Sequence, residues 1–288
     1  MRIATTAIFS IGLLAVAPVT AQEDGSTVKT KQEKPQEPLS TLVRASDALG
    51  SKVRTGLQEN ADTIGTLDDI IVNTSNGQAL FGVVSTGGFL GIGETHTAVP
   101  CDLLVWNQRP GTDKAFLVLE TTKQKLGSAP KFETAKLEHC LSDDAWRKET
   151  TAAFGSCPKL DKVAKMSEAD GKKSDDPQRV DASATGTKVC PYRMASKLRG
   201  ATLRGVNDKI GDIDDLILDR NDNVITYVVV GDSPVPWNVL SLRDNDLYVA
   251  KTKEEFKAAP KLEKDAVARL TNKEFCARVK SFYSSEKK

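Results

Sequence analysis

Short apolar runs alternate with turn-forming residues along most of the chain. The runs "IIV", in Ile64–Asn73, and "LIL", in Ile210–Asp219, are each followed by a polar pair, Asn76-Gly77 or Asp222-Asn223, and then by a second apolar run, "ALFGVVS" or "VITYVVV". Asn-Gly between two such runs is a strong signal of a tight β-hairpin, and Asp-Asn is a weaker one. Short, closely spaced strands with turns between them predict a small antiparallel β-barrel.

The pattern occurs twice in the same order. "IGTLDDIIVN" returns as "IGDIDDLILD", "VPCDLL" as "VPWNVL", "TTKQKLGSAPKF" as "KTKEEFKAAPKL", and "RASDALGSKV" as "RMASKLRGATL". The chain therefore contains a duplicated domain, and two copies make a tandem rather than a solenoid. The fold class that we predict is mainly β, with two tandem antiparallel barrels that are each followed by short helices.

Helical segments are expected after each barrel. Thr252 and Glu255 have the spacing of a capping box, and Pro260 ends the helix that they start. Thr271 and Glu274 have the same spacing before "FCARVKSF", and Ser142 precedes "DDAWRKETTAAF".

Two polar stretches separate these parts, and their lack of large apolar side chains predicts flexible segments. The predicted order is a signal peptide at 1–21, a flexible tether at 22–40, a first barrel domain at 41–135, a helical extension at 136–160, a disordered linker at 161–187, a second barrel domain at 188–265 and a C-terminal helix at 266–288.

The N-terminus predicts export. Met1-Arg2 is positive, Ile8 to Val16 are apolar, and "VTA" at 19–21 provides the small side chains that a signal peptidase reads, so cleavage is expected after Ala21. The apolar run is too short to span a membrane, and no later run reaches about 18 apolar residues. We expect a protein of the periplasm or the extracellular space that does not span a membrane.

The net charge argues against one class of partner. The chain has 40 basic and 39 acidic residues, so it lacks the positive field that drives binding to nucleic acid, and no nucleic-acid partner is expected.

Five cysteines enter an oxidising compartment, where disulfides are permitted. Cys101 lies in an apolar run and is expected to be buried; Cys140, Cys157, Cys190 and Cys276 are candidates for disulfides in any of three pairings, of which Cys157–Cys190 is favoured because it closes the linker.

The duplicated pattern resembles the PRC-barrel family, the small β-barrel found in the H subunit of the photosynthetic reaction centre and in a ribosome maturation factor. The resemblance rests on "ASDALGSKV", on the stretch from "IGTLDDIIVN" to "ETHTAVP" and on "TKQKLGSAPKF" in the first copy, and on "ASKLRGATL", "IGDIDDLILDRNDNVITYVVVG", "VPWNVL" and "TKEEFKAAP" in the second. It implies a binding or assembly module rather than an enzyme. The matching positions are strands and turns, so no catalytic residue is carried over.

The glycines of "STGGFLGIGETHTAVP" (85–100) are not predicted to bind a phosphate, because no helix start follows them. Val229-Val230 align with Val83-Val84 and Val235-Pro236 with Val99-Pro100, so the second copy makes the same connection with ten residues fewer. The stretch is therefore expected to be a hairpin loop. Its apolar residues Phe89, Leu90 and Ile92 either fold back over the barrel or form a contact surface for a partner.

Two further groups of residues are candidates for chemistry. Glu94 and His96 lie on one face of a strand, as metal ligands can, but no third ligand is marked in the sequence. The pairs Asp68-Asp69 and Asp214-Asp215 are expected to hydrogen-bond to turns, because neighbouring strand residues point to opposite faces. His139-Cys140 is not expected to be a nucleophile pair.

The sequence favours a non-enzymatic interaction or scaffold protein with a protein partner and without a cofactor. The alternative is a protein that binds a small ligand or a cation through the acidic turns and the Glu94/His96 face.

Overall fold

The two copies are seen directly in the structure, a computed structural model that describes residues 41–58, 60–87, 94–108, 115–159, 190–243, 246–263 and 267–284. Several predictions concern residues outside these ranges: the signal peptide with its cleavage after Ala21, the tether, the linker, and Phe89, Leu90 and Ile92 in the hairpin loop. Residues from Gln36 to Lys288 belong to one compact unit, so both copies lie within it.

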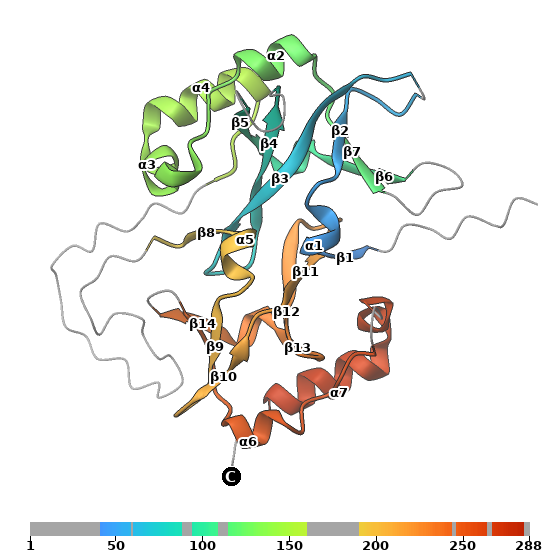
Figure 1. The fold of residues 1–288 in the computed structure, drawn as a ribbon, viewed down its shortest axis with the longest axis vertical. Coiled ribbons are helices and arrows are strands. Elements are labelled where there is room, and N and C mark those ends of the chain that lie inside the picture. Colours follow the sequence, from blue (N-terminus) through green and yellow to red (C-terminus); the bar gives the residue numbers. More distant parts are fainter. Residues whose placement is uncertain are drawn as a thin grey trace, which may run out of the picture. The chain divides into compact units, whose positions relative to one another are not determined.

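The first repeat consists of short strands followed by helices (Figure 1). In chain order its elements are β1 (Leu42–Arg44), α1 (Ala45–Ala48), β2 (Lys52–Arg54), β3 (Thr63–Asn73), β4 (Ala79–Thr86), β5 (Thr95–Pro100), the 3-10 turn η1 (Cys101–Leu103), β6 (Val105–Gln108), β7 (Ala115–Val118), α2 (Lys123–Ser128), η2 (Thr134–Lys136), α3 (Leu137–Ser142) and α4 (Asp144–Phe154).

The second repeat follows the same order. Its elements are β8 (Tyr192–Met194), α5 (Ala195–Leu198), β9 (Thr202–Arg204), β10 (Lys209–Asp212), β11 (Asp215–Asp219), β12 (Val224–Val230), β13 (Ser233–Pro236), η3 (Trp237–Val239), β14 (Leu240–Arg243), β15 (Asp246–Val249), α6 (Lys253–Phe256), η4 (Val267–Thr271) and α7 (Lys273–Ser284). The mainly β fold with two repeats and following helices is thus confirmed.

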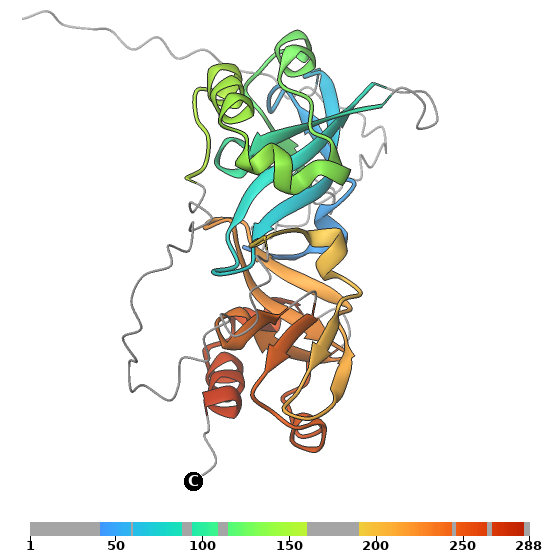
Figure 2. The ribbon, with the colours of Figure 1, turned by 90° about the vertical axis from the view of Figure 1, so that its left-hand side faces the viewer.

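The repeats exchange their first strands. Strand β1 of the first repeat pairs antiparallel with β11 of the second, with Arg44 opposite Ile217. Strand β8 of the second repeat pairs in the same way with β3 of the first, with Met194 opposite Ile71. The two ladders use equivalent positions of the two sequences, so the exchange is reciprocal, and Figures 1 and 2 show each donated strand beside the other repeat.

The strands do not form the closed barrels that the sequence predicted. In the first repeat one sheet has the order β5-β4-β3-β2-β7-β6, and β8 is added to β3. In the second repeat the strands divide into two sheets, β1-β11-β12-β13 and β10-β9-β15-β14. Among the described residues no ladder joins β5 to β6 or β13 to β14. The donated strands are added elsewhere, β8 beside the end of β3 and β1 beside β11, so that neither of these strands presents an uncovered edge there.

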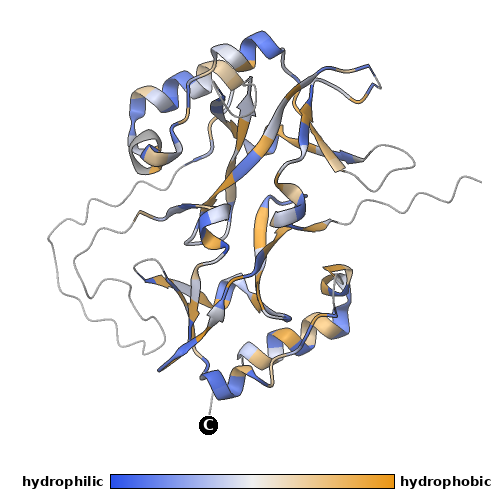
Figure 3. Cartoon of the chain, viewed as in Figure 1, coloured by the Kyte–Doolittle hydropathy of each residue, from blue (hydrophilic) through white to orange (hydrophobic). Residues whose placement is uncertain are grey.

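The exchanged strands also complete the hydrophobic cores. Tyr192 of β8 packs in a cluster with Phe81 and with Trp146 of α4, and the rings of Phe81 and Trp146 lie edge to face at 5.8 Å. Leu42 of β1 packs with Phe275 of α7 in the corresponding cluster of the second repeat. A third cluster contains buried residues of both repeats, and Figure 3 shows the middle of strand β11, which contributes to it, as hydrophobic. Each covering helix therefore packs partly on a strand from the other copy.

The helix caps agree with the predicted positions in one case and differ by a residue in two. Thr252 and Glu255 form the predicted capping box of α6. For α7 the cap is Asn272, whose side chain accepts from the amide of Phe275 at 3.0 Å, rather than Thr271. For α4 it is Asp143 rather than Ser142. Asn and Asp accept from an amide at least as well as Ser or Thr, so spacing alone selected the wrong neighbour.

The two predicted hairpin turns are present, and they need left-handed backbone. Gly77 has φ 78° and Asn223, its counterpart, has φ 52°. Glycine adopts this conformation without strain, and asparagine is the side chain that tolerates it best. The first turn also contacts the second repeat, because the Gly77 carbonyl accepts from the amide of Ile225 at 2.7 Å, and a Cβ at Gly77 would lie 2.7 Å from the Ile225 carbonyl oxygen.

Each repeat supplies one buried carboxylate that caps a helix of the other repeat. The capped helices, α1 and α5, directly follow the exchanged strands β1 and β8. Asp215 accepts from the amide of Ser46 at 3.1 Å and from its hydroxyl at 2.5 Å, at the start of α1. Asp69 accepts from the amide of Ser196 at 3.1 Å, at the start of α5. The residues at the N-cap positions, Arg44 and Met194, make no side-chain cap of their own. The carboxylates therefore tie each helix start to the partner sheet.

Substituting these two carboxylates tests the exchange. Asp215 also lies 3.8 Å from the Arg44 guanidinium and 3.4 Å from that of Arg199. We therefore expect Asp215→Ala to lower the free energy of unfolding by about 2 kcal/mol or more and Asp69→Ala by about 1 kcal/mol. Urea denaturation measures both, with Asp68→Ala as the exposed control. Losses at positions 69 and 215 no larger than at 68 would contradict the assignment.

Alkaline pH should weaken the packing of α7. The Tyr227 hydroxyl of β12 donates to Sγ of Cys276 in α7 at 3.9 Å, and burial raises the pKa of Tyr227 to about 12. Tyrosine in the unfolded chain ionises near pH 10, so between about pH 10 and about pH 12 the unfolded state binds fewer protons and the free energy of unfolding falls. Urea denaturation across this interval should show a smaller fall for Tyr227→Phe. An equal fall in both proteins would show that Tyr227 is not responsible.

Candidate functional site

In each of the repeated acidic pairs, one carboxylate is buried and its neighbour lies at the surface. Asp69 and Asp215 point inward and are 4% and 5% exposed, whereas Asp68 points to the surface with a side chain that is 32% exposed. The two carboxylates of a pair therefore do not converge on one ion. The inner members, Asp69 and Asp215, are buried in the fold, and the outer members, Asp68 and Asp214, lie at the surface.

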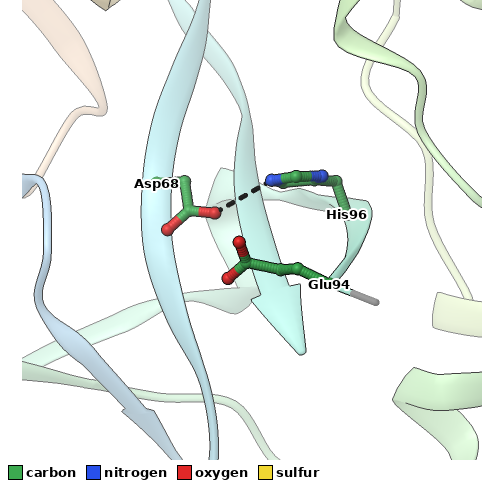
Figure 4. A group of neighbouring side chains, drawn as sticks. All are labelled: Asp68, Glu94 and His96. Atoms are coloured by element: carbon green, nitrogen blue, oxygen red, sulfur yellow. Dashed lines mark ion pairs between the residues drawn. The ribbon is translucent and has the colours of Figure 1, made fainter. Parts of the chain in front are cut away.

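Asp68, Glu94 and His96 come together on one face of the first repeat's sheet (Figure 4). Nε2 of His96 lies 3.1 Å from Oδ2 of Asp68, and the ligand atoms of all three side chains lie within 4.8 Å of one another. Glu94 and His96, which the sequence placed on a common face, thus gain a third member from a distant strand. The sequence did not identify Asp68 as that member, because only the pairing of β3, β4 and β5 brings it near.

A β-bulge places Asp68 in this group. In the β3–β4 ladder Leu67 is opposite Val84 and Asp69 is opposite Val83, so Asp68 is the extra residue between them. A bulge turns its additional side chain away from the regular alternation. On the far side of β4, His96 is opposite Ser85, and its main-chain carbonyl accepts from the amide of Phe132 at 2.8 Å. Asp68 and His96 are thus anchored on hydrogen-bonded strands.

The equivalent carboxylate of the second repeat has a different partner. Asp214 accepts from the backbone amide of Gly231 at 2.5 Å, in the short turn between β12 and β13. In the first repeat the longer connection replaces that turn, and Asp68 pairs with His96 instead. The cluster is therefore particular to the first repeat.

The structure describes the side chains of four of the five cysteines. Cys101 is buried as expected, and burial raises the pKa of its thiol far above the ordinary range. Cys157 and Cys276 are thiols in the structure, and burial also raises the pKa of Cys157. Cys157 and Cys190 both pack against the cluster that contains Phe81. The side chains of His139 and Cys140 lie outside the described residues, and the disulfide pairings stay predictions.

Two equivalent loops expose large hydrophobic side chains. Among the described residues three large hydrophobic side chains are strongly exposed: Leu57 (61%), Val206 (62%) and Val105 (55%). Leu57 follows β2 and Val206 follows β9, each directly after a glycine, so the two lie in corresponding loops of the two repeats, although the first loop is four residues longer. The signal in the sequence is the repeated "GL" and "GV" after a short strand, which the sequence analysis did not use.

Hydrogen bonds hold the backbone of both loops. The Arg54 guanidinium donates to the carbonyls of Gln58 and Ala61 at 3.0 and 3.1 Å, inside the loop that carries Leu57. In the second repeat the amide of Val206 donates to the Lys251 carbonyl at 3.0 Å, while Arg204 pairs with Asp246. The exposed apolar side chains are therefore presented on loops whose backbone is hydrogen-bonded to the sheet.

Two surface recesses adjoin the exchanged strands. One, of about 280 Å³, is polar and is lined by residues that include Arg44, Ser46 and Asp215 of the capping contact. The other, of about 320 Å³, contains Trp106 with the Arg220 guanidinium 5.4 Å from its ring centre. Burial lowers the pKa of Arg220. Both recesses are explained by the junction of the two repeats.

Comparison with protein families agrees with this geometry. The model of the PRC-barrel domain matches residues 41–125 and 193–256, which include the strands of both repeats and together make up just over half of the chain. The chain belongs to the PRC-barrel family. Its two PRC repeats are the two copies described above, and the family assignment confirms the resemblance on which the sequence analysis relied. A search of curated proteins finds no match to the chain.

Within the part of the PRC tandem that the structure describes, no helix has both the length and the apolar character needed to cross a bilayer.

The Asp68–His96 pair should add little to stability. Both side chains are 32% exposed, and an ion pair at that exposure contributes less than about 1 kcal/mol. Asp68→Ala and His96→Ala should therefore each change the free energy of unfolding by less than about 1 kcal/mol in urea denaturation. A much larger loss would mean that the cluster is part of the structural core rather than an accessible site.

Proposed function

We propose that the protein is a non-enzymatic interaction module, exported to the periplasm or beyond, whose two PRC repeats bind a protein partner. The observation that carries the proposal is the equivalent exposure of Leu57 and Val206 on corresponding loops of the two repeats. A large apolar side chain held in water is unfavourable for an isolated protein and favourable when a partner covers it. Occurrence in the corresponding loop of both copies argues for a shared use.

The architecture supports binding at two points. Both loops belong to one compact unit, so a single chain offers two exposed apolar side chains for contact. The near-neutral charge favours a protein partner over nucleic acid. Export rests on the N-terminal pattern with its expected cleavage after Ala21.

Lack of catalysis is supported by the way the ionisable groups are used. The two buried carboxylates, Asp69 and Asp215, are occupied in capping helices. Burial raises the pKa of the Cys101 thiol, which therefore stays protonated and is a poor nucleophile. Fold alone does not determine function, so the proposal depends on the loops.

The test is capture of partners from a periplasmic extract by the immobilised protein. We expect Leu57→Ser and Val206→Ser each to reduce the retained partner, and the double variant to lose it, because bivalent attachment fails when both contacts are removed. Each substitution should change stability by less than about 0.5 kcal/mol, since the side chains are exposed.

Val105→Ser is the matched control. Val105 is similarly exposed, but the second repeat has Ser241 at the equivalent position, so the change copies a residue that the fold already accepts. Capture should survive it. Equal retention by the double variant and the wild type, or no retained protein in either, would refute the proposed function.

A further inference from the structure

We propose that Asp68, Glu94 and His96 bind one divalent transition-metal ion, with zinc as the best fit. Carboxylate oxygens and an imidazole nitrogen are the ligands that zinc takes together in proteins. A site made of two carboxylates alone would suit magnesium or calcium equally well, and the imidazole of His96 shifts the preference toward zinc and its neighbours.

The distances agree with a tetrahedral site. Donor atoms that bind zinc at about 2.0–2.1 Å are about 3.3 Å apart along the edges of the tetrahedron. Nε2 of His96 and Oδ2 of Asp68 already lie 3.1 Å apart. The carboxylate of Glu94 lies within 4.8 Å of both, and its side chain has three rotatable bonds, so a rotamer change brings it into range.

The charges favour a cation at this point. Two carboxylates beside one imidazole leave net negative charge on a small area, and a divalent ion compensates it. His96 and Asp68 are 32% exposed, so an ion can enter from solvent. Three protein ligands leave a fourth position open to water.

Comparison of Asp68 with its equivalent in the second repeat shows whether the fold itself needs the cluster. Its equivalent carboxylate, Asp214, is used by the fold, because it accepts from the Gly231 amide in the short turn. The first repeat has ten residues more in this connection, and these bring Glu94 and His96 to Asp68. The fold does not require the cluster, since the repeat without it forms the same strands.

Calorimetric titration of the full secreted chain with Zn²⁺, after removal of any affinity tag, tests the proposal. We expect one ion per chain and a loss of affinity of at least about tenfold in His96→Gln. The chain has only two histidines, so His139→Gln is a matched control that should leave the affinity unchanged. Asp68→Asn should weaken binding and Asp214→Asn should not.

Cobalt gives a second measurement of the same site. Co²⁺ in a tetrahedral environment has visible absorption that octahedral aqueous Co²⁺ largely lacks, and we expect this band in the wild type and in His139→Gln but not in His96→Gln. This readout reports coordination geometry directly and does not depend on any activity of the protein.

Several results would overturn the proposal. They are the absence of stoichiometric Zn²⁺ binding, binding of unchanged affinity in His96→Gln, and binding lost in Asp214→Asn but kept in Asp68→Asn. Binding that persists in His96→Gln and disappears after alkylation of the thiols would assign the ion to cysteines and equally refute it. Far-UV circular dichroism of each variant confirms that loss of binding is not loss of fold. Failure here leaves the partner-binding loops unaffected, because Leu57 and Val206 are not part of the cluster.

Discussion

The hydrogen bonds between a buried carboxylate of one repeat and a helix start of the other are the interaction on which the structure depends. A carboxylate that is almost fully buried is costly unless it is paired or accepts hydrogen bonds. Asp215 meets this requirement through Ser46, and Asp69 meets it through Ser196. Each carboxylate also accepts from an amide of its own strand, Ile70 for Asp69 and Leu216 for Asp215, but the amide at the helix start comes from the other repeat. The two copies must therefore come together for these capping contacts to form.

The exchange gives β3 and β11 each a neighbouring strand from the other repeat. Without it β11 would be the edge of its sheet, and Ile71–Asn73 of β3 would lack a strand on one side. The donated strands bring Leu42 and Tyr192 under the covering helices of the other copy. Surface features are then free to differ between the repeats, as the metal-ligand cluster does, or to be retained in both, as the exposed loops are.

Much of the fold could be predicted from the sequence, because its signals are local. The duplication, the strands, the turns at Gly77 and Asn223 and the capping box at Thr252 depend on neighbouring residues. The exchange could not be predicted, since alternating apolar residues indicate a strand without saying which strand it pairs with. For the same reason Glu94 and His96 could be placed on one face, whereas Asp68, which reaches them only through the bulge in β3, could not.

Unfolding followed at one tryptophan in each repeat tests most directly whether the two copies fold as one. Trp146 belongs to α4 after the first repeat and Trp237 is buried in the second, so variants that keep only one of the two as their sole tryptophan place the probe in a different repeat. In urea, fluorescence and far-UV circular dichroism should give the same midpoint within each variant, because loss of one repeat removes a strand and a cap from the other. A fluorescence midpoint that differs from the circular dichroism midpoint, with one repeat still folded, would contradict the reciprocal exchange.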